Sequence, residues 1–355
     1  MKALIAMSGG VDSSVAALLM AEKGYECIGC TMKLYANEDI ELCRDNTCCS
    51  LDDVEDAKSV AKRLGMPHHT FNFKEKFRET VIDDFINCYE NGMTPNPCIQ
   101  CNKHMKFDEL YRRGQILGCD KIVTGHYVRI RKTDKGYQLL KAMDSNKDQS
   151  YVLYNMTQEE LAHTEFPLGE LTKDEVRKIA ESNGFINANK PDSQDICFVP
   201  DGDYVGALKR FTGKEYEPGQ FVDTNGNVLG EHKGIVSYTI GQRKGLGIAY
   251  EHPLYVVELD VPNNKVVLGK NEDLFSKEAL VENINWIDPE DDRTEIRCKA
   301  KVRYRMTEQP CVVKKIDATK ALVIFDEPQR AITPGQSAVF YEDEVVLGGG
   351  TIVRQ

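Results

Sequence analysis

The chain has 355 residues, of which 41% are hydrophobic and 28% are charged, and its net charge is −11 at pH 7. This balance excludes a disordered chain, and the length predicts about two to three domains. No run approaches the roughly 18 consecutive apolar residues that a membrane span needs, which excludes a membrane protein. The acidic total argues against a purely electrostatic nucleic-acid binder, so any such contact should be local.

The first half of the sequence alternates strand and helix patterns. Strands are expected at 2–7, 26–32, 68–73 and 121–125. Helices are expected at 12–23, 51–65, around 77–86, at 107–117 and at 171–184. In 51–65 the apolar residues recur at helical spacing, and Gly65 stands where a helix would end. Strands that alternate with helices predict a parallel sheet covered by helices.

After about residue 205 the helical periodicity fades, and short β segments lie between turn signals such as Asn225-Gly226. Strands spaced in this way predict β-rich modules, the last of them a barrel. The fold class is therefore expected to be α/β with β-rich additions. We expect a catalytic domain at 1–204, a small central β-rich domain at 205–268 and a C-terminal β-barrel at 269–355.

The segment SGGVDSS, residues 8–14, stands between the first strand and the first helix. Gly9 and Gly10 allow a sharp turn and the close approach of an anion, which the N–H groups of the following helix can bind. Asp12 is a candidate ligand for Mg²⁺. The pattern is not a Walker A loop. A strand-to-helix turn capped by serine and aspartate is the alternative, but the full heptapeptide favours phosphate binding.

The twelve cysteines include a C-x-x-C, formed by Cys98 and Cys101, which follows Pro95 and Pro97 just before an expected helix. A thiol beside Lys103, His104 and a helix N-terminus should have a lowered pKa and be nucleophilic. Cys197 lies far along the chain. Because the loop motif begins too early to leave room for a leader peptide, we expect a reducing cytoplasm, where such cysteines indicate metal ligation or sulfur chemistry.

The loop SGGVDSS resembles the pyrophosphate loop of ATP pyrophosphatases, which split ATP between the α- and β-phosphates and adenylate an acceptor. Further motifs follow in the order seen in tRNA-specific 2-thiouridylases, which the chain resembles essentially from end to end. These motifs are TPNPCIQCNKHMKF, TGHYVR, DSNKDQSY, DSQDICF, GQRKGLGI and TPGQSAVFY. The resemblance implies a HUP-like N-terminal domain and ATP-dependent replacement of the C2 oxygen of the wobble uridine (U34) by sulfur, in tRNAs for Lys, Glu and Gln.

The resemblance also implies residue roles, with ATP and Mg²⁺ as cofactors. Cys197 matches the position that carries a persulfide, and Cys101 matches its nucleophilic partner, which forms a transient disulfide or releases the thiolated base. The positions for ATP are Ala6, Met7, Ser8, Gly9, Gly10, Val11, Asp12, Ser13, Met32 and Gly125. The target base would contact Asn96, Pro97 and Cys98. The positions for tRNA are His126, Lys147, Asp148, Gln149, Arg303, Tyr304 and Gln336.

The residues themselves bear on two of these assignments. Gly125 ends a strand, where a bare backbone would let a nucleotide pack closely. His126 is equally compatible with a histidine whose bonds are satisfied inside the protein. The implied partners are tRNA and a persulfide donor, either a cysteine desulfurase or a sulfur-relay protein, with no membrane.

One residue departs from the better-known members, which carry Asp at the position of Cys98. The thiolates of Cys98, Cys101 and Cys197 could instead hold a [4Fe–4S] cluster with one iron open to sulfide, or a zinc ion. A C-x-x-C suits either route, so both stay open. A second group, Cys43, Cys48 and Cys49, is compatible with metal binding, redox chemistry or simple packing.

The segment RCKAKVRYR, residues 297–305, alternates basic and apolar residues. In a strand this period of two would place all its basic side chains on one face and the apolar ones in the core. Like charges without an intervening acid repel each other, so we expect this face to contact tRNA phosphates rather than only solvent.

Two other functions use parts of the same pattern. An ammonia-using ligase such as GMP synthetase would share the loop but would not need Cys101 and Cys197, and it usually carries a glutaminase domain, of which no nucleophile-and-triad pattern is evident. A non-catalytic tRNA or sulfur-carrier module would form no AMP, which an intact loop argues against.

Overall fold

The structure is a computed structural model that describes residues 1–36, 51–191 and 196–354. Its N-terminal part contains a parallel sheet with the strand order β3-β2-β1-β4-β7. The strands are β1 (Lys2–Ala6), β2 (Glu26–Lys33), β3 (His68–Asn72), β4 (Lys121–Val123) and β7 (Thr164–Glu165). Ala3, Leu4 and Ile5 are fully buried, as the middle strand of a sheet covered on both faces requires. The expected parallel-sheet domain is confirmed.

Helices cover both faces of this sheet. One face packs against α1 (Val11–Glu22), α2 (Leu51–Arg63) and α8 (Lys173–Ser182). The other face packs against two helical runs, α3 (Lys74–Phe77), η2 (Arg78–Ile82) and α4 (Asp83–Glu90), then α5 (Pro97–Cys101), η3 (Asn102–Glu109) and α6 (Leu110–Ile116). Leu4 points to the second face and Ile5 to the first, because successive strand residues alternate.

The helix expected at 107–117 begins ten residues earlier, at Pro97. Cys98 and Cys101 therefore lie within its first turns and not on a loop before it, which corrects the sequence interpretation. Asn96 supplies the N-cap that a sequence pattern dominated by the two prolines hid, and a proline is well tolerated at the first helical position.

The central part contains α9 (Tyr204–Thr212) and a sheet in the order β10-β11-β8-β9. Its strands are β8 (Gly219–Asp223), β9 (Val228–His232), β10 (Tyr255–Asp260) and β11 (Lys265–Gly269). The expectation of β structure from residue 205 is wrong for α9. That helix starts at the cap of Asp203, whose carboxylate accepts the N–H of Gly206 at 2.9 Å, and it ends at Gly213 with φ +66°.

The C-terminal part is a closed barrel, as expected. Its strands run in the order β12-β15-β14-β13-β16-β17, and β12 also pairs with β17. They are β12 (Phe275–Trp286), β13 (Glu295–Lys301), β14 (Gln309–Lys315), β15 (Ala321–Arg330), β16 (Ser337–Glu342) and β17 (Val345–Ile352).

A hairpin that the sequence analysis did not predict joins the N-terminal part to this barrel. It consists of β5 (Val128–Thr133) and β6 (Gly136–Lys141), and β6 pairs with β17 through Leu139 and Leu140. The short helix α7 (Gln158–Ala162) and the 3₁₀ turns at 150–152, 235–237 and 271–274 complete the described elements.

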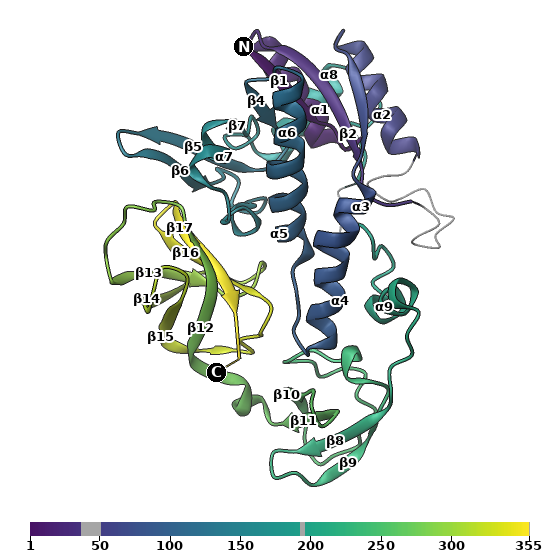
Figure 1. The fold of residues 1–355 in the computed structure, drawn as a ribbon, viewed down its shortest axis with the longest axis vertical. Coiled ribbons are helices and arrows are strands. Elements are labelled where there is room, and N and C mark those ends of the chain that lie inside the picture. Colours follow the sequence, from purple (N-terminus) through teal and green to yellow (C-terminus); the bar gives the residue numbers. More distant parts are fainter. Residues whose placement is uncertain (37–50, 192–195, 355) are drawn as a thin grey trace.

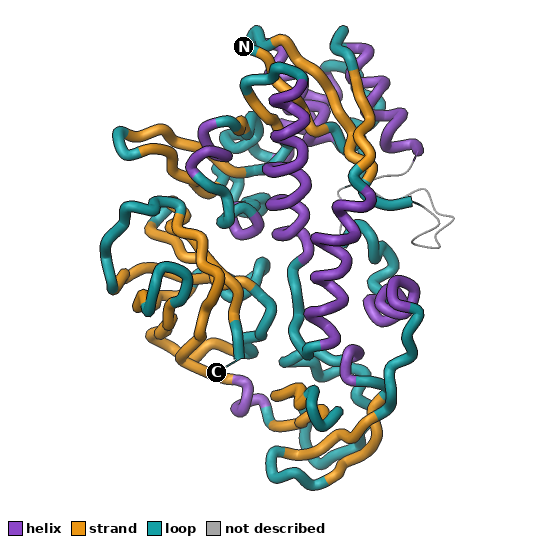
Figure 2. The backbone as a smooth tube through the Cα atoms, in the orientation of Figure 1, coloured by secondary structure: helices purple, strands orange, loops and turns teal. Residues whose placement is uncertain are grey.

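The parts are arranged around the two helical runs. In Figure 1 the parallel sheet lies at the top, the central sheet at the bottom and the barrel at the left, with α4 and the α5–α6 run between them. Figure 2 shows that helices gather in the N-terminal part, while strands make up most of the rest. One apolar core runs from Leu4 of β1 through Phe77, Phe85 and Phe198 to Phe221 of the central sheet. We call it the inter-domain core.

Replacing Phe340 with alanine should destabilise the barrel by about 3–5 kcal/mol, because a large cavity would replace a ring that is fully buried. The ring stacks on Trp286 at a centroid distance of 5.6 Å. Denaturant unfolding followed by tryptophan fluorescence would measure the change. The matched variant Phe275→Ala removes a ring that is 44% exposed and should cost only about 0.5 kcal/mol. Equal losses would contradict this packing.

Candidate active site

The segment 8–14 forms the turn between β1 and α1. Gly9 has a φ of +79°, and Gly10 is the extended N-cap of α1. The Gly10 carbonyl accepts hydrogen bonds from the hydroxyls of Ser13 and Ser14, both at 3.0 Å, and the Ser8 N–H donates to Ser13 Oγ at 3.2 Å. The serines thus fix the turn in place. Because the first N–H groups of a helix have no acceptor within the helix, the turn presents donors suited to an anion.

Two glycines let other backbone segments approach this loop. A Cβ on Gly9 would collide with the carbonyl oxygen of Asp53 in α2. A Cβ on Gly125 would lie 2.8 Å from the carbonyl carbon of Asp12 and from the nitrogen of Ser13. The bare backbone of Gly125 therefore makes room for the start of α1. The nucleotide contact expected at this residue stays a prediction.

The carboxylate of Asp12 forms an ion pair with a lysine that the sequence analysis missed. Lys173 Nζ donates to both carboxylate oxygens of Asp12 at 2.8 Å, and the Tyr127 hydroxyl donates to Oδ1 at 2.7 Å. Lys173 is only 7% exposed. It begins α8, whose alternation of basic and acidic residues resembles a solvated helix face, so the local pattern contains no signal for this contact.

The remaining positions expected for ATP gather at the ends of neighbouring strands. Ala6 ends β1 and is paired with Cys30 of β2, and Met32 follows on β2. The Met7 carbonyl accepts the Thr31 hydroxyl at 2.8 Å. Because β1 and β2 are parallel, their carboxyl ends lie together, where ligands bind in open α/β sheets.

The C-x-x-C opens the helical run α5–α6. The Asn96 side chain accepts the Cys98 N–H at 3.2 Å. Cys98 is exposed, whereas Cys101 is half-buried and packs against the inter-domain core. The π-helical segment η3 follows Cys101 directly, and π-helical turns are frequent at functional sites.

The residues just before the C-x-x-C are held by the other two parts of the chain. The Thr94 N–H donates to the Pro334 carbonyl at 2.9 Å, and Gln336 Nε2 donates to the Thr94 carbonyl at 2.7 Å. A Cβ on Gly335, whose φ is +88°, would lie 2.8 Å from the Thr94 nitrogen. From the central part, Thr239 Oγ1 lies 3.5 Å from Thr94 Oγ1. We call this contact region the three-way junction.

Cys197 lies on the same core as Cys101. Cys197 is half-buried against the inter-domain core, and its backbone carbonyl accepts a hydrogen bond from the Tyr35 hydroxyl at 2.9 Å. The next residue, Phe198, is buried and packs edge-to-face on Phe77 and Phe85 at 5.7 and 5.2 Å. The structure therefore brings Cys101 and Cys197 to one core, although they are far apart in sequence.

The cluster hypothesis for Cys98, Cys101 and Cys197 does not fit this arrangement. Within residues 1–36, 51–191 and 196–354, no three His, Cys, Asp or Glu side chains are grouped closely enough to hold a metal ion, and all three of these cysteines lie in those ranges. Cys43, Cys48 and Cys49 lie outside the described residues.

His126 is buried, in line with the alternative reading of this residue. It is 7% exposed, its Nδ1 lies 2.7 Å from Thr124 Oγ1 and its Nε2 lies 3.2 Å from Lys106 Nζ. Burial lowers the pKa of His126 well below its usual value, and the charge of Lys106 lowers it further. A tRNA contact at this residue would require the surroundings to move.

The other positions expected for tRNA lie near the C-x-x-C. Burial raises the pKa of Tyr304, and the charges of Asp148 and Cys98 raise it further, so these groups are electrostatic neighbours. Tyr304 is 39% exposed. Gln149 lies beside Lys147 and Asp148, and its Oε1 accepts the Tyr127 N–H at 2.9 Å. Gln336 contacts Thr94 just before the C-x-x-C, and Tyr304 packs against Tyr151, two residues after the 147–149 segment, with ring centroids 5.8 Å apart.

The expected basic stripe is only partly right. In β13 the basic residues 297, 299 and 301 alternate with the buried residues Ile296, Cys298 and Ala300, as predicted. The strand ends at Lys301, however, so Arg303 and Arg305 are not on its face. The Arg303 guanidinium turns inward and donates to the Ile240 carbonyl, the Ala331 carbonyl and the Thr333 hydroxyl at 3.2, 3.0 and 2.6 Å.

Arg297 also departs from the expectation that this stripe needs an outside partner. Its guanidinium pairs with Asp326 of β15, with Nη1 2.7 Å from Oδ1. A neighbouring strand therefore supplies an acid that the local sequence does not show. Lys299 and Arg305 are exposed.

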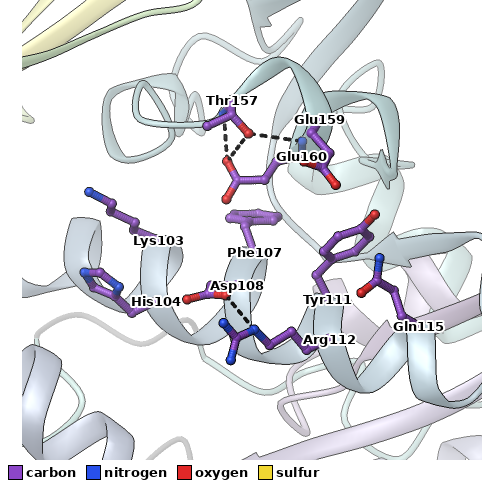
Figure 3. A pocket seen from close by; sticks show the side chains of 10 residues that line it. All are labelled: Lys103, His104, Phe107, Asp108, Tyr111, Arg112, Gln115, Thr157, Glu159 and Glu160. Carbon is purple, nitrogen blue, oxygen red and sulfur yellow. Dashed lines mark hydrogen bonds and ion pairs between the residues drawn. The ribbon is translucent and has the colours of Figure 1, made fainter.

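A pocket of about 380 Å³ lies along the helical run beyond Cys101. Figure 3 shows Lys103 and His104 at one end of it and the Glu160–Thr157 cap of α7 facing the helix. Burial lowers the pKa of His104, and Lys103 lowers it further. Lys103 and His104 thus line this pocket, and none of the residues expected to bind ATP does.

The free energy of unfolding should decrease as the pH falls below about 6.5, because an unfolded histidine takes up a proton there while folded His126 stays neutral. The stability contributed by this lowered pKa is present above that pH and lost below it. Urea unfolding at pH 7.5 and 5.5 would measure the decrease, which should be smaller in His126→Gln. Some dependence should remain, because burial also lowers the pKa of His68. An unchanged pH dependence in the variant would contradict the assignment.

Three family models match consecutive parts of the chain. They are the tRNA methyl transferase HUP domain at 1–201, the tRNA methyl transferase PRC-barrel domain at 206–270 and the aminomethyltransferase beta-barrel domain at 276–352. No described helix is long and apolar enough to cross a membrane. Among solved structures, a 4-thiouridine synthetase–RNA complex with bound ATP is 18% identical, with a TM-score of 0.38 over 60% of this chain and 50% of that chain.

Curated relatives match over nearly their whole length. The tRNA-specific 2-thiouridylase MnmA of Clostridioides difficile (strain 630) is 50% identical over 99% of this chain and 98% of the relative. The protein of Acetivibrio thermocellus with the same name is 49% identical over 99% of both chains. Together with the HUP-domain model over more than half of the sequence, these matches show that the chain belongs to the tRNA-specific 2-thiouridylase family.

Proposed function

We propose that this member of the 2-thiouridylase family thiolates the wobble uridine of tRNAs for Lys, Glu and Gln, using ATP at the phosphate loop and sulfur carried by Cys197. The observation that carries the proposal is the inter-domain core. It holds Leu4 of β1, the strand that leads into the phosphate loop, and both Cys101 and Cys197 pack against it. One core thus supports the nucleotide site and both sulfur-bearing residues.

The first step activates the base. The uracil C2 oxygen attacks the α-phosphorus of ATP, pyrophosphate leaves, the N3 proton is lost to solvent and an O-adenylated uridine forms. Oxide is a poor leaving group, whereas AMP is a good one, so this step makes substitution at C2 feasible. Loop N–H groups would bind the phosphates. Asp12 suits Mg²⁺, which commonly needs one or two carboxylates besides the phosphates and would neutralise their charge.

The second step delivers sulfur. The terminal sulfur of a Cys197 persulfide attacks C2 and AMP leaves, so that a disulfide links C2 to Cys197. The Cys101 thiolate then attacks the Cys197 sulfur, the electron pair of the broken bond stays on the sulfur at C2, and a Cys101–Cys197 disulfide remains. An external dithiol reduces that disulfide. A cysteine desulfurase or a relay protein would reload Cys197 with persulfide sulfur.

The exposed C-x-x-C face would receive the base. The Asn96–Cys98 turn directly follows Thr94, which is held at the three-way junction. An anticodon base must leave its stack to reach such a turn, as in other enzymes that act on bases. We therefore place the anticodon loop between the barrel and the 147–149 segment.

Cys101→Ser and Cys197→Ser should each reduce tRNA thiolation by about 10³-fold or more, because each removes a nucleophile that the sulfur step needs. Pyrophosphate release in a single turnover with tRNA should persist, because activation uses neither thiol. Mass spectrometry of digested tRNA would measure thiolation. Cys119→Ser is the matched control, since burial raises the pKa of that thiol and it should react little. Thiolation at the native rate in either active-site variant would refute the route.

Arg305→Ala should weaken tRNA binding and reduce the slope of log K against log salt by about 1, because it removes one exposed cation from the phosphate contacts. Arg303→Gln should leave the slope unchanged, because its guanidinium is bonded inside the three-way junction. Filter binding between 50 and 200 mM salt, a range of about fourfold, would measure both. A smaller slope for Arg303→Gln alone would reverse the assignment.

A further inference from the structure

Lys106 and His126 connect the helical run of the C-x-x-C with the carboxyl end of β4. Lys106 belongs to η3 and lies one π-helical turn after Cys101, and His126 closely follows β4. The Lys106 Nζ lies 3.2 Å from His126 Nε2. The pair therefore links the element that carries two of the cysteines to the sheet that carries the phosphate loop.

The carboxyl end of β4 is adjacent to that loop. In the strand order β3-β2-β1-β4-β7, the chain leaves β1 toward β2 and later returns to β4 on the other side of β1, so the order reverses between β1 and β4. Ligands of open α/β sheets bind at the carboxyl ends of the strands at such a reversal. A Cβ on Gly125, next to His126, would lie 2.8 Å from the Ser13 nitrogen. The Lys106–His126 pair thus lies at the edge of the site proposed for ATP.

The imidazole of His126 is a neutral acceptor for the ammonium. Burial lowers the pKa of His126 well below its usual value. Because an ammonium can only donate, Nε2 accepts from Lys106 and Nδ1 carries the ring proton. That proton is donated to Thr124 Oγ1, 2.7 Å away. The Phe166 ring packs edge-to-face on the imidazole with the centroids 6.0 Å apart. The imidazole therefore orients the lysine and leaves its charge uncancelled.

This neutral partner distinguishes Lys106 from the lysines that contact the phosphate loop. Lys173 donates to both carboxylate oxygens of Asp12, and Lys190 pairs with two aspartates of α2. Among the described residues, no carboxylate forms an ion pair with Lys106, which is half-buried. Because a charge taken out of water needs a counter-charge, a half-buried ammonium with only a neutral partner favours binding of an anion.

We propose that Lys106 is a further catalytic residue whose ammonium contacts the α-phosphoryl group while the base is activated, and that His126 is its positioning residue. The inference rests on the proposed adenylation of uridine at this site. The α-phosphorus is bonded to pyrophosphate before that step and to the uracil oxygen after it, so it lies between the phosphate loop and the C-x-x-C. A pre-oriented cation between these two elements stabilises the charge on its non-bridging oxygens in the transition state.

The direct test is the single-turnover rate of pyrophosphate release with ATP and tRNA. Lys106→Gln keeps an N–H donor for His126 but removes the charge, and it should reduce this rate by about 10²- to 10³-fold. Lys106→Arg keeps the charge and should stay within about tenfold of the native rate. Arg112→Met is the matched control and should behave as native, because it removes an exposed cation of the same helical run that already pairs with Asp108 at 3.3 Å.

Two further readouts separate catalysis from a structural role. The dissociation constant of α,β-methylene ATP, whose scissile bond is blocked, should change by less than about threefold in Lys106→Gln, because a catalytic contact strengthens in the transition state. ATP that carries sulfur in place of one non-bridging α-oxygen exists as two diastereomers. The native protein should use one of them at least about tenfold more slowly than the other, because sulfur accepts a hydrogen bond weakly. Lys106→Gln should lose this difference.

A native rate in Lys106→Gln, an unchanged discrimination between the diastereomers, or an equal loss of rate in Arg112→Met would overturn the inference alone. A dissociation constant that rises as much as the rate falls would also overturn it, because the lysine would then only bind ATP. If Lys106→Gln does not fold, equal rates with the two diastereomers in the native protein would have the same force. Failure of the native protein to release pyrophosphate in the presence of tRNA would overturn the proposed function as well.

Discussion

The hydrogen bonds between Thr94 and the barrel residues Pro334 and Gln336 are the constraint on which the arrangement of this molecule depends. They fix the start of the helix that carries Cys98 and Cys101 with groups that come from more than 230 residues later in the chain. Backbone bonds of this kind need close approach, which Gly335 allows by lacking a side chain. Cys98 and Cys101 therefore belong to the N-terminal part, but contacts with the C-terminal part fix their position.

The sequence predicted the parallel sheet, the closed barrel and the family well, for physical reasons. The strand and helix periodicity of the first half can be recognised from neighbouring residues alone. The phosphate loop can be recognised in the same way, because it requires only glycines followed directly by a helix. The start of the α5–α6 run was misjudged because the prolines of 95–97 suggested a stiff loop, although proline is well accommodated in a first helical turn. Helix α9 was missed because its cap at Asp203 lies where the helical pattern was fading.

The contacts that the sequence could not reveal are those between distant elements. Lys173 reaches Asp12 across 161 positions, and Arg297 finds its acid, Asp326, on a neighbouring strand. Arg303 belonged to an alternating pattern, yet the strand stops at Lys301 and the guanidinium turns inward. An alternating pattern fixes the faces of a strand only as far as the strand extends, and pairing with other strands decides where it ends.

The pairing of β6 with β17 has a consequence for how the chain can be divided. Leu139 and Leu140 join an N-terminal hairpin to the last strand of the barrel, and Arg129 adds an ion pair to Glu344 at 2.7 Å. A fragment that ended before the barrel would leave β6 as an unprotected sheet edge next to apolar side chains, an arrangement that favours association between chains. The modules visible along the sequence are thus not independent units. Truncation would yield a fragment that tends to aggregate and not a shorter active enzyme.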